Sequence, residues 1–91
     1  MKKLNEILGT EFPFIQGGMA NIATGEFAAA CSNAGALGMI ATGGWDGDRL
    51  RQEIRRAKEL TDKPFGVNLM LMNPYADDIA RIILEEGVKV V

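Results

Sequence analysis

The middle of the chain carries the segment that decides the fold, Lys63-Pro64-Phe65-Gly66-Val67-Asn68-Leu69. Pro64 ends the helical pattern before it, because proline disfavours helical backbone in the preceding residue. The next five residues are small or apolar except for Asn68, which is typical of a parallel strand that is covered on both faces. Parallel strands are joined by crossover connections that usually contain a helix. We therefore expect helices on both sides of this strand.

Helical patterns flank the strand on both sides. Upstream, a helix is predicted from Asp46 or Asp48 to Leu60, and another over residues 25–34 with Thr24 as N-cap and Gly35 after its end. Downstream, Asn73-Pro74 predicts a helix that starts with Asn73 as N-cap and ends at Gly87. The apolar stripes expected to be buried are Phe27, Ala30, Cys31 and Ala34; Leu50, Ile54, Ala57 and Leu60; and Ala76, Ile79, Ala80 and Ile83.

Further short strands are predicted over residues 14–16, 37–41 and 88–91, and a short helix over 1–8. The result is three β-α units followed by a fourth strand, which predicts an α/β fold with a parallel sheet. The turn after the first strand, Gln16-Gly17-Gly18-Met19-Ala20-Asn21, lacks the G-x-G-x-x-G pattern of an open nucleotide-binding sheet. A partial (β/α)8 TIM barrel is therefore favoured. Because a complete barrel takes roughly 250 residues, we expect residues 1–91 to be an N-terminal fragment of one barrel domain.

Composition excludes several classes of function. The 91 residues are 47% hydrophobic and 24% charged, with a net charge of −2, so no nucleic-acid partner is expected. No apolar run approaches the roughly 20 residues of a membrane span, and the N-terminus does not resemble a signal peptide. The single cysteine, Cys31, fits a reducing cytoplasm and is expected to be buried. The sequence contains no histidine, so neither a histidine base nor a metal site is predicted.

Two short segments are candidates for ligand binding, because the carboxyl ends of parallel strands form the binding mouth in such folds. Gly17-Gly18 leaves the backbone bare, so a flat ring can approach it, and the sulfur of Met19 can lie against an aromatic ring. The alternative is a tight turn that requires positive φ, and composition alone favours this alternative. Asn68 is predicted to be a buried amide, which either binds a heterocycle or is satisfied by neighbouring backbone.

Two loops at the same expected end are less specific. The loop Thr42-Gly43-Gly44-Trp45 either lines the mouth or is simply anchored by its tryptophan, and the second interpretation is favoured. Met70-Leu71-Met72 either contacts an apolar substrate or packs in the ordinary way. No catalytic residue is identified.

Three segments together resemble a known superfamily, that of nitronate monooxygenases and enoyl-ACP reductase II. They are Phe14–Ala20 with its Q-G-G-M motif, Ser32–Ile40, and Leu60–Leu69 with its K-P-F-G-V-N motif. The final run, Ile83–Val91, more closely resembles the enoyl-ACP reductase branch.

The resemblance implies a flavin-dependent barrel that binds FMN noncovalently. In the enoyl reductase branch, hydride passes from NAD(P)H through FMN to an enoyl thioester on acyl carrier protein, as a step of fatty acid biosynthesis. By analogy, Gly17, Gly18 and Met19 contact the flavin ring and Asn68 hydrogen-bonds it. The alternative activity is that of a nitronate monooxygenase, which uses FMN and oxygen.

The family's phosphate site and its histidine lie outside these residues. We therefore expect the 91-residue chain alone to bind flavin weakly and to show no turnover. Its outer strands are expected to be open edges that are prone to self-pairing, so a homodimer and an inert fragment are both open alternatives.

Overall fold

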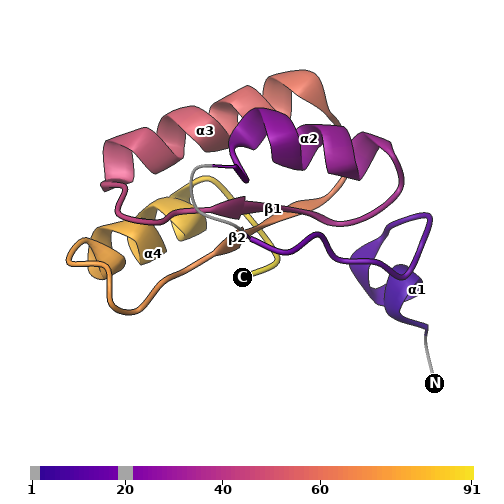
Figure 1. The fold of residues 1–91 in the computed structure, drawn as a ribbon, viewed down its shortest axis with the longest axis horizontal. Helices are drawn as coiled ribbons and strands as arrows, with labels where there is room; N and C mark the ends of the chain where they lie inside the picture. Colours follow the sequence, from indigo (N-terminus) through magenta and orange to yellow (C-terminus); the bar gives the residue numbers. More distant parts are fainter. Residues whose placement is uncertain (1–2, 19–21) are drawn as a thin grey trace.

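The structure, a computed structural model, describes residues 3–18 and 22–91. From α2 onward, helices and strands alternate along the chain, as Figure 1 shows. The elements are α1 (Leu4–Leu8), α2 (Gly25–Asn33), β1 (Gly38–Ala41), α3 (Gly47–Leu60), β2 (Phe65–Asn68) and α4 (Ala76–Glu85).

The strands β1 and β2 pair in parallel, in a register that runs from Gly38 opposite Phe65 to Ala41 opposite Asn68. Single parallel bridges extend the pairing on both sides, from Ile15 to Leu37 and from Gly66 to Val90. Each segment thus lies beside the one that precedes it in the chain. This singly wound order is the order of a barrel, whereas a doubly wound sheet reverses its strand order.

The predicted strands 14–16 and 88–91 are each reduced to one bridge. Each has a neighbour on only one side within the described residues, so it gains fewer ladder hydrogen bonds than β1 or β2. The expected parallel α/β arrangement is confirmed by β1 and β2, and the two outer segments extend it with the same direction.

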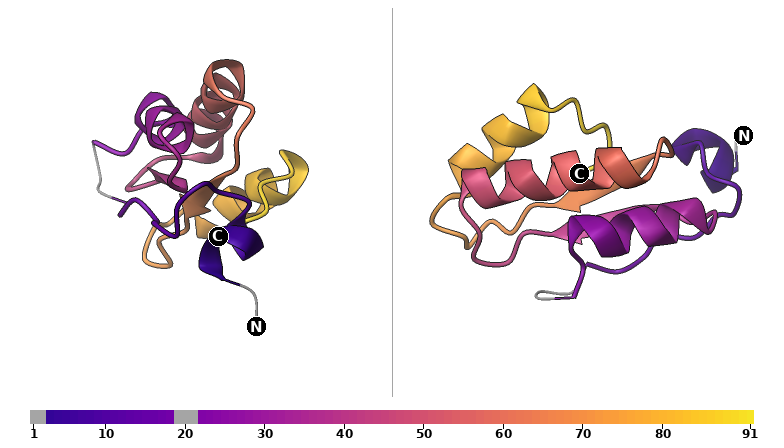
Figure 2. Two further views of the ribbon diagram at one scale, coloured as in Figure 1. Left: turned by 90° about the vertical axis from the view of Figure 1, so that its right-hand side faces the viewer. Right: turned by 90° about the horizontal axis from the view of Figure 1, so that it is seen from above.

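The core lies between the sheet and the helices. Figure 2 shows α2 and α3 side by side over the strands, with α4 next to α3. Ile40 of β1 and Val67 of β2 point into this layer and are fully buried. The predicted stripe of α3 is confirmed at Leu50, Ile54 and Ala57, but Leu60 is 38% exposed. On α4, Ile79 and Ile83 are buried as predicted, and Ile82 joins them.

The predicted buried stripe of α2 is wrong. The residues that it buries are Gly25, Ala28, Ala29 and Ser32, whereas Phe27 is 38% exposed and Cys31 is only partly buried. The reason is the close approach of α2 to its neighbours. A Cβ added at Gly25 would lie 2.1 Å from the Glu53 carbonyl oxygen, and one added at Gly38 would lie 1.9 Å from that of Ala28. Only the face with small residues fits so close to α3 and β1.

Most helix ends follow the predictions. Thr24 and Asp46 are N-caps whose side chains accept from the main-chain N–H groups of Phe27 and Arg49. Gly35 and Gly87 adopt positive φ after α2 and α4. The predicted start of α4 is wrong, because Asn73 is not its N-cap and the helix begins at Ala76.

Charged side chains link the outer faces of α3 and α4. Arg51 contacts Glu85 at 2.6 Å and Glu86 at 3.3 Å, and Arg55 contacts Glu86 at 3.2 Å. On α4 itself, Arg81 contacts Asp78 at 3.6 Å and Glu85 at 2.9 Å.

This charge network predicts a loss of stability in acid. Hydrogen bonds from Arg51 and then Arg81 lower the pKa of Glu85 below its ordinary value of 4.5. A carboxylate whose pKa is lower in the folded chain stabilises the fold above its unfolded-state pKa, and this stabilisation is lost as the pH falls through the folded-state pKa. We expect the free energy of unfolding, measured by urea titration, to fall less between about pH 6 and about pH 3 in Glu85→Gln than in the unaltered chain.

The control for this prediction is Asp77→Asn, which removes an exposed carboxylate that no ion pair involves within the described residues. If Glu85→Gln and Asp77→Asn show the same acid dependence as the unaltered chain, the network does not contribute to stability.

Candidate functional site at the carboxyl ends of the strands

The predicted ligand-binding residues Gly18 and Asn68 come together. Asn68 ends β2 and lies opposite Ala41, which ends β1. A Cβ added at Gly18 would lie 3.3 Å from the Asn68 Cβ, 3.5 Å from its Nδ2 and 3.6 Å from the Ala41 Cβ. We call Gly17, Gly18, Ala41 and Asn68 the carboxyl rim. Two segments fifty residues apart in the sequence therefore meet at one end of the sheet, as the flavin interpretation requires.

Asn68 is exposed, so the prediction of a buried amide is wrong. Its position is fixed through its main chain instead. The Thr42 hydroxyl donates to the Asn68 carbonyl oxygen at 3.0 Å, and Thr42 is itself only 1% exposed. No described residue hydrogen-bonds the Asn68 side-chain amide. Among the described residues, this amide at the rim therefore has a donor and an acceptor without a partner.

Gly17 and Gly18 are not the residues of a left-handed turn. Positive φ occurs at Gly9, Gly35, Gly43 and Gly87, and at neither rim glycine. The turn alternative is therefore wrong. Gly18 is explained by its close approach to Asn68, but a Cβ added at Gly17 would meet nothing within 4 Å. Gly17 presents bare backbone to open space, which is what close approach of a ligand requires. Met19 lies outside the described residues.

Thr42 and Asn73 hold the loops around the rim, and the sequence did not predict either role. The side chain of Asn73 is 6% exposed and joins two loops. Its Nδ2 donates to the carbonyl oxygens of Gly43 at 2.9 Å and Trp45 at 3.0 Å, and its Oδ1 accepts from the Tyr75 N–H at 2.8 Å. The predicted anchoring of the first loop by Trp45 is confirmed, because its ring packs on the core. The Arg49 guanidinium lies 4.5 Å from the centroid of that ring.

Replacing Asn73 with alanine is expected to loosen both loops. Three hydrogen bonds of a buried amide are lost and their main-chain partners are left without them, so the free energy of unfolding should fall by about 1–3 kcal/mol. Urea titration measures this loss, and hydrogen exchange at Tyr75 locates it. Asn33→Ala is the matched control, since Asn33 donates to the Leu60 carbonyl oxygen away from these loops. Unchanged exchange at Tyr75 in Asn73→Ala would contradict the assignment.

The loop after β2 leaves apolar side chains uncovered. Met70 is 43% exposed, Leu71 82% and Met72 93%. Ordinary packing therefore does not account for them within the described residues. In the sequence they follow Asn68 after one intervening residue, Leu69.

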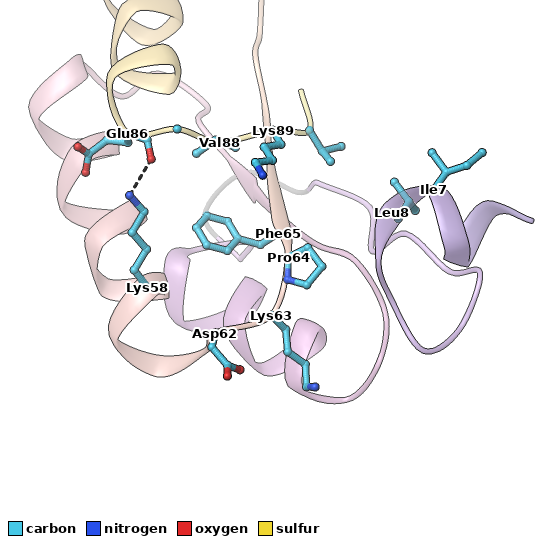
Figure 3. A pocket seen from close by; sticks show the side chains of 12 residues that line it. Ile7, Leu8, Lys58, Asp62, Lys63, Pro64, Phe65, Glu86, Val88 and Lys89 are labelled. Atoms are coloured by element: carbon cyan, nitrogen blue, oxygen red, sulfur yellow. Dashed lines mark hydrogen bonds between the residues drawn. The ribbon is translucent and has the colours of Figure 1, made fainter. Parts of the chain in front are cut away.

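A hollow of about 510 Å³ lies at the opposite end of the sheet. Figure 3 shows Phe65 in its wall and Lys58 reaching the Glu86 carbonyl, to which its Nζ donates at 2.7 Å. Phe65 begins β2, whereas Asn68 ends it. The hollow is thus separate from the carboxyl rim, and the carboxyl ends of the strands are where parallel α/β folds bind ligands.

The chemistry of the carboxyl rim fits the ring of a flavin. Bare peptide at Gly17 accommodates a flat ring, and the Asn68 amide matches the alternating donors and acceptors of its polar edge. The described residues contain no cluster of three or more side chains that could ligate a metal. Nor does this part of the chain have a helix of the length and apolarity that crossing a bilayer demands.

Comparison with known proteins gives consistent matches. A family model described as nitronate monooxygenase matches residues 1–90. A protein of Mycobacterium tuberculosis named (3aS,4S,5R,7aS)-5-hydroxy-7a-methyl-1-oxo-octahydro-1H-indene-4-carboxyl-CoA dehydrogenase is 39% identical over 87 residues, which is 96% of this chain and 24% of that protein. A nitronate monooxygenase of Pseudomonas aeruginosa is 44% identical over 79 residues, or 87% of this chain and 22% of that protein.

Among solved structures, FabK from Thermotoga maritima matches with a TM-score of 0.92 and 43% identity, over 97% of this chain and 28% of that one. The chain thus spans about a quarter of the length of the relatives that it matches.

Proposed function

Because the chain belongs to the nitronate monooxygenase family, whose enzymes are flavin-dependent oxidoreductases, we propose that its carboxyl rim holds the isoalloxazine ring of FMN in a (β/α)8 barrel enzyme. The observation that carries this proposal is the contact of Gly18, which follows the first strand segment, with Asn68, which ends β2 on the other side of β1. A flavin supplies the acceptor and donor of hydride when it is bound, while the protein supplies position and polarity.

The chain's own residues would act by position. Gly17 leaves its peptide open to the ring, since nothing within 4 Å occupies the place of its missing Cβ. Asn68 offers a donor and an acceptor to the polar edge of the ring, and Thr42 keeps Asn68 at the strand end by its 3.0 Å hydrogen bond. The exposed Leu71 and Met72 provide an apolar surface beside the ring for an acyl chain.

For the substrate, we propose an enoyl thioester on acyl carrier protein, with NAD(P)H as the electron donor. The resemblance of Ile83–Val91 to the enoyl-ACP reductase branch motivates this choice. A thioester also appears in the name of the M. tuberculosis relative, a carboxyl-CoA dehydrogenase. The apolar loop after Asn68 suits an acyl chain better than a small nitronate anion.

The second candidate is oxidation of a nitronate with oxygen. It is favoured by the family model over residues 1–90 and by the 44% identity to the P. aeruginosa nitronate monooxygenase. Both candidates use the same carboxyl rim, so they differ in the substrate and in the electron acceptor rather than in the flavin contacts.

One comparison of substrates tests the choice. The whole protein that carries this chain is purified with FMN and mixed with NADH or NADPH, with and without an enoyl thioester. We expect oxidation of NAD(P)H that depends on the thioester. Oxygen uptake with an alkyl nitronate, together with indifference to thioesters, would favour the second candidate. A protein that does not retain or rebind FMN would refute both.

A further inference from the structure

The hydrogen-bond ladder between the first strand segment and β1 changes at Gln16. Upstream, Leu37 N–H donates to the Phe14 carbonyl oxygen at 2.8 Å, and Gln16 N–H donates to the Leu37 carbonyl oxygen at 2.9 Å. In a regular parallel ladder, the next donor, Met39 N–H, would pair with the main-chain carbonyl of Gln16. Instead it donates to the side-chain Oε1 of Gln16 at 2.7 Å.

The side-chain amide of Gln16 thus takes the place of a main-chain carbonyl. This substitution frees the main chain to leave the strand path while the N–H of Met39 keeps a partner. The other end of the same amide is also engaged, because Nε2 donates to the Gly17 carbonyl oxygen. One amide therefore joins β1 to the first peptide of the carboxyl rim.

After Gln16 the main chain leads into the carboxyl rim. Two residues after Gln16, Gly18 lies against Asn68 and Ala41, at 3.3 and 3.6 Å from its missing Cβ. Between them, Gly17 makes no such contact, so its orientation depends on the bonds on either side of it. Gln16 supplies the bond on the side of β1.

We propose that Gln16 is a positioning residue that holds the Gly17-Gly18 peptides in the orientation that receives the flavin ring. This inference rests on the proposed flavin site. The proposed role requires one side chain that accepts from the Met39 N–H and also donates to the Gly17 carbonyl oxygen. A glutamine amide has both an acceptor and a donor. An ionised glutamate keeps the acceptor and lacks the donor, and a methionine of similar length lacks an amide altogether.

The test uses the whole protein in its apo form with three variants. They are Gln16→Glu, Gln16→Met and a control, Gln52→Met, which replaces an exposed glutamine of α3. Hydrogen exchange at Met39 measures the bond to β1, thermal unfolding measures stability, and titration with FMN measures the dissociation constant and the absorbance spectrum of the bound flavin.

In Gln16→Met we expect Met39 to exchange about tenfold faster and the FMN dissociation constant to rise about tenfold, as loss of hydrogen bonds of this kind implies. In Gln16→Glu, Met39 should stay protected while FMN binding weakens and the spectrum of the bound flavin shifts. Gln52→Met should change none of these.

Two results would overturn the inference, and they are distinguishable. If the unaltered protein binds FMN and Gln16→Met binds it equally well with the same spectrum, Gln16 has no positioning role, although the proposed function stands. If the unaltered protein does not bind FMN, the proposed function fails and this inference fails with it.

Discussion

Replacing Gly38 with alanine is expected to remove a large part of the free energy that stabilises the folded chain. A Cβ at this position would lie 1.9 Å from the Ala28 carbonyl oxygen, 2.6 Å from the Ala28 carbonyl carbon and 2.8 Å from the Ser32 Oγ. The first two atoms belong to the backbone of α2 and cannot rotate away, so α2 has to move off β1 as a body. Overpacking typically costs about 1–3 kcal/mol where side chains adjust. Here we expect the free energy of unfolding to fall by at least about 3 kcal/mol. This is a large part of the roughly 5–15 kcal/mol that stabilises a small domain.

The same site explains why the displacement of α2 is costly. Ser32 donates to the Pro64 carbonyl oxygen at 2.8 Å and accepts from the Gly38 N–H at 3.0 Å. Moving α2 breaks both bonds and opens the layer that contains Ile40. The added methyl group in Gly38→Ala thus disturbs hydrogen bonds to β1 and to Pro64, the residue before β2.

Urea titration followed by circular dichroism measures the effect, with Gly44→Ala as control. Gly44 is a suitable control because its φ is not positive and an added Cβ would meet nothing within 4 Å. In this control we expect the free energy of unfolding to change by less than about 0.5 kcal/mol, as for an ordinary surface substitution. A Gly38→Ala chain with the midpoint of the unaltered chain would contradict the tight contact of α2 with β1.

The order and type of the elements were predictable because they depend on local patterns. Asp46 and Thr24 precede runs with helical spacing, and their capping roles follow from their own side chains. The stripe of α3 was predictable at Leu50 and Ile54 because this helix is polar elsewhere, so only one face can be buried.

The buried face of α2 was not predictable in the same way. Nearly all of its residues are small or apolar, so hydrophobicity does not distinguish Phe27 and Cys31 from Ala28 and Ala29. The choice depends on how closely β1 and α3 approach, which is a property of the assembled layers. Likewise, Asn73 looks like an N-cap in the sequence, and only the fold brings Gly43 and Trp45 close enough for its amide to bind them instead.

The candidate site was predictable in its location but not in its supports. Gly17-Gly18 follows one predicted strand and Asn68 lies near the end of another, and parallel strands place their carboxyl ends together. The bonds that hold these residues come from side chains with no distinctive local pattern. Thr42 lies in a loop and Gln16 in a short strand, and each acquires its role through a partner far away in the sequence.

The second large effect is expected on flavin binding, from Gly17→Val. Because a Cβ at Gly17 meets nothing within 4 Å and its φ is not positive, the apo protein should unfold at nearly the temperature of the unaltered one. A bound ring against this peptide would collide with the added side chain. Steric costs of about 1–3 kcal/mol correspond to a rise of roughly 5- to 150-fold in the FMN dissociation constant. Titration of the whole apo protein with FMN, followed by flavin fluorescence, measures this change.

Asn68→Ala and Gly44→Val separate the flavin explanation from a general effect of substitution near the strand ends. Asn68→Ala removes an exposed side-chain amide that binds no described residue, so it should leave stability unchanged and weaken FMN by about tenfold through the lost hydrogen bonds. Gly44→Val adds the same bulk as Gly17→Val in the neighbouring loop, where we place no flavin, and should leave FMN binding unchanged.

If Gly17→Val binds FMN as tightly as the unaltered protein, the bare peptide is not a flavin contact. The unstrained, uncrowded glycine at position 17 would then have no ligand to account for it, because neither its φ nor its neighbours require glycine there.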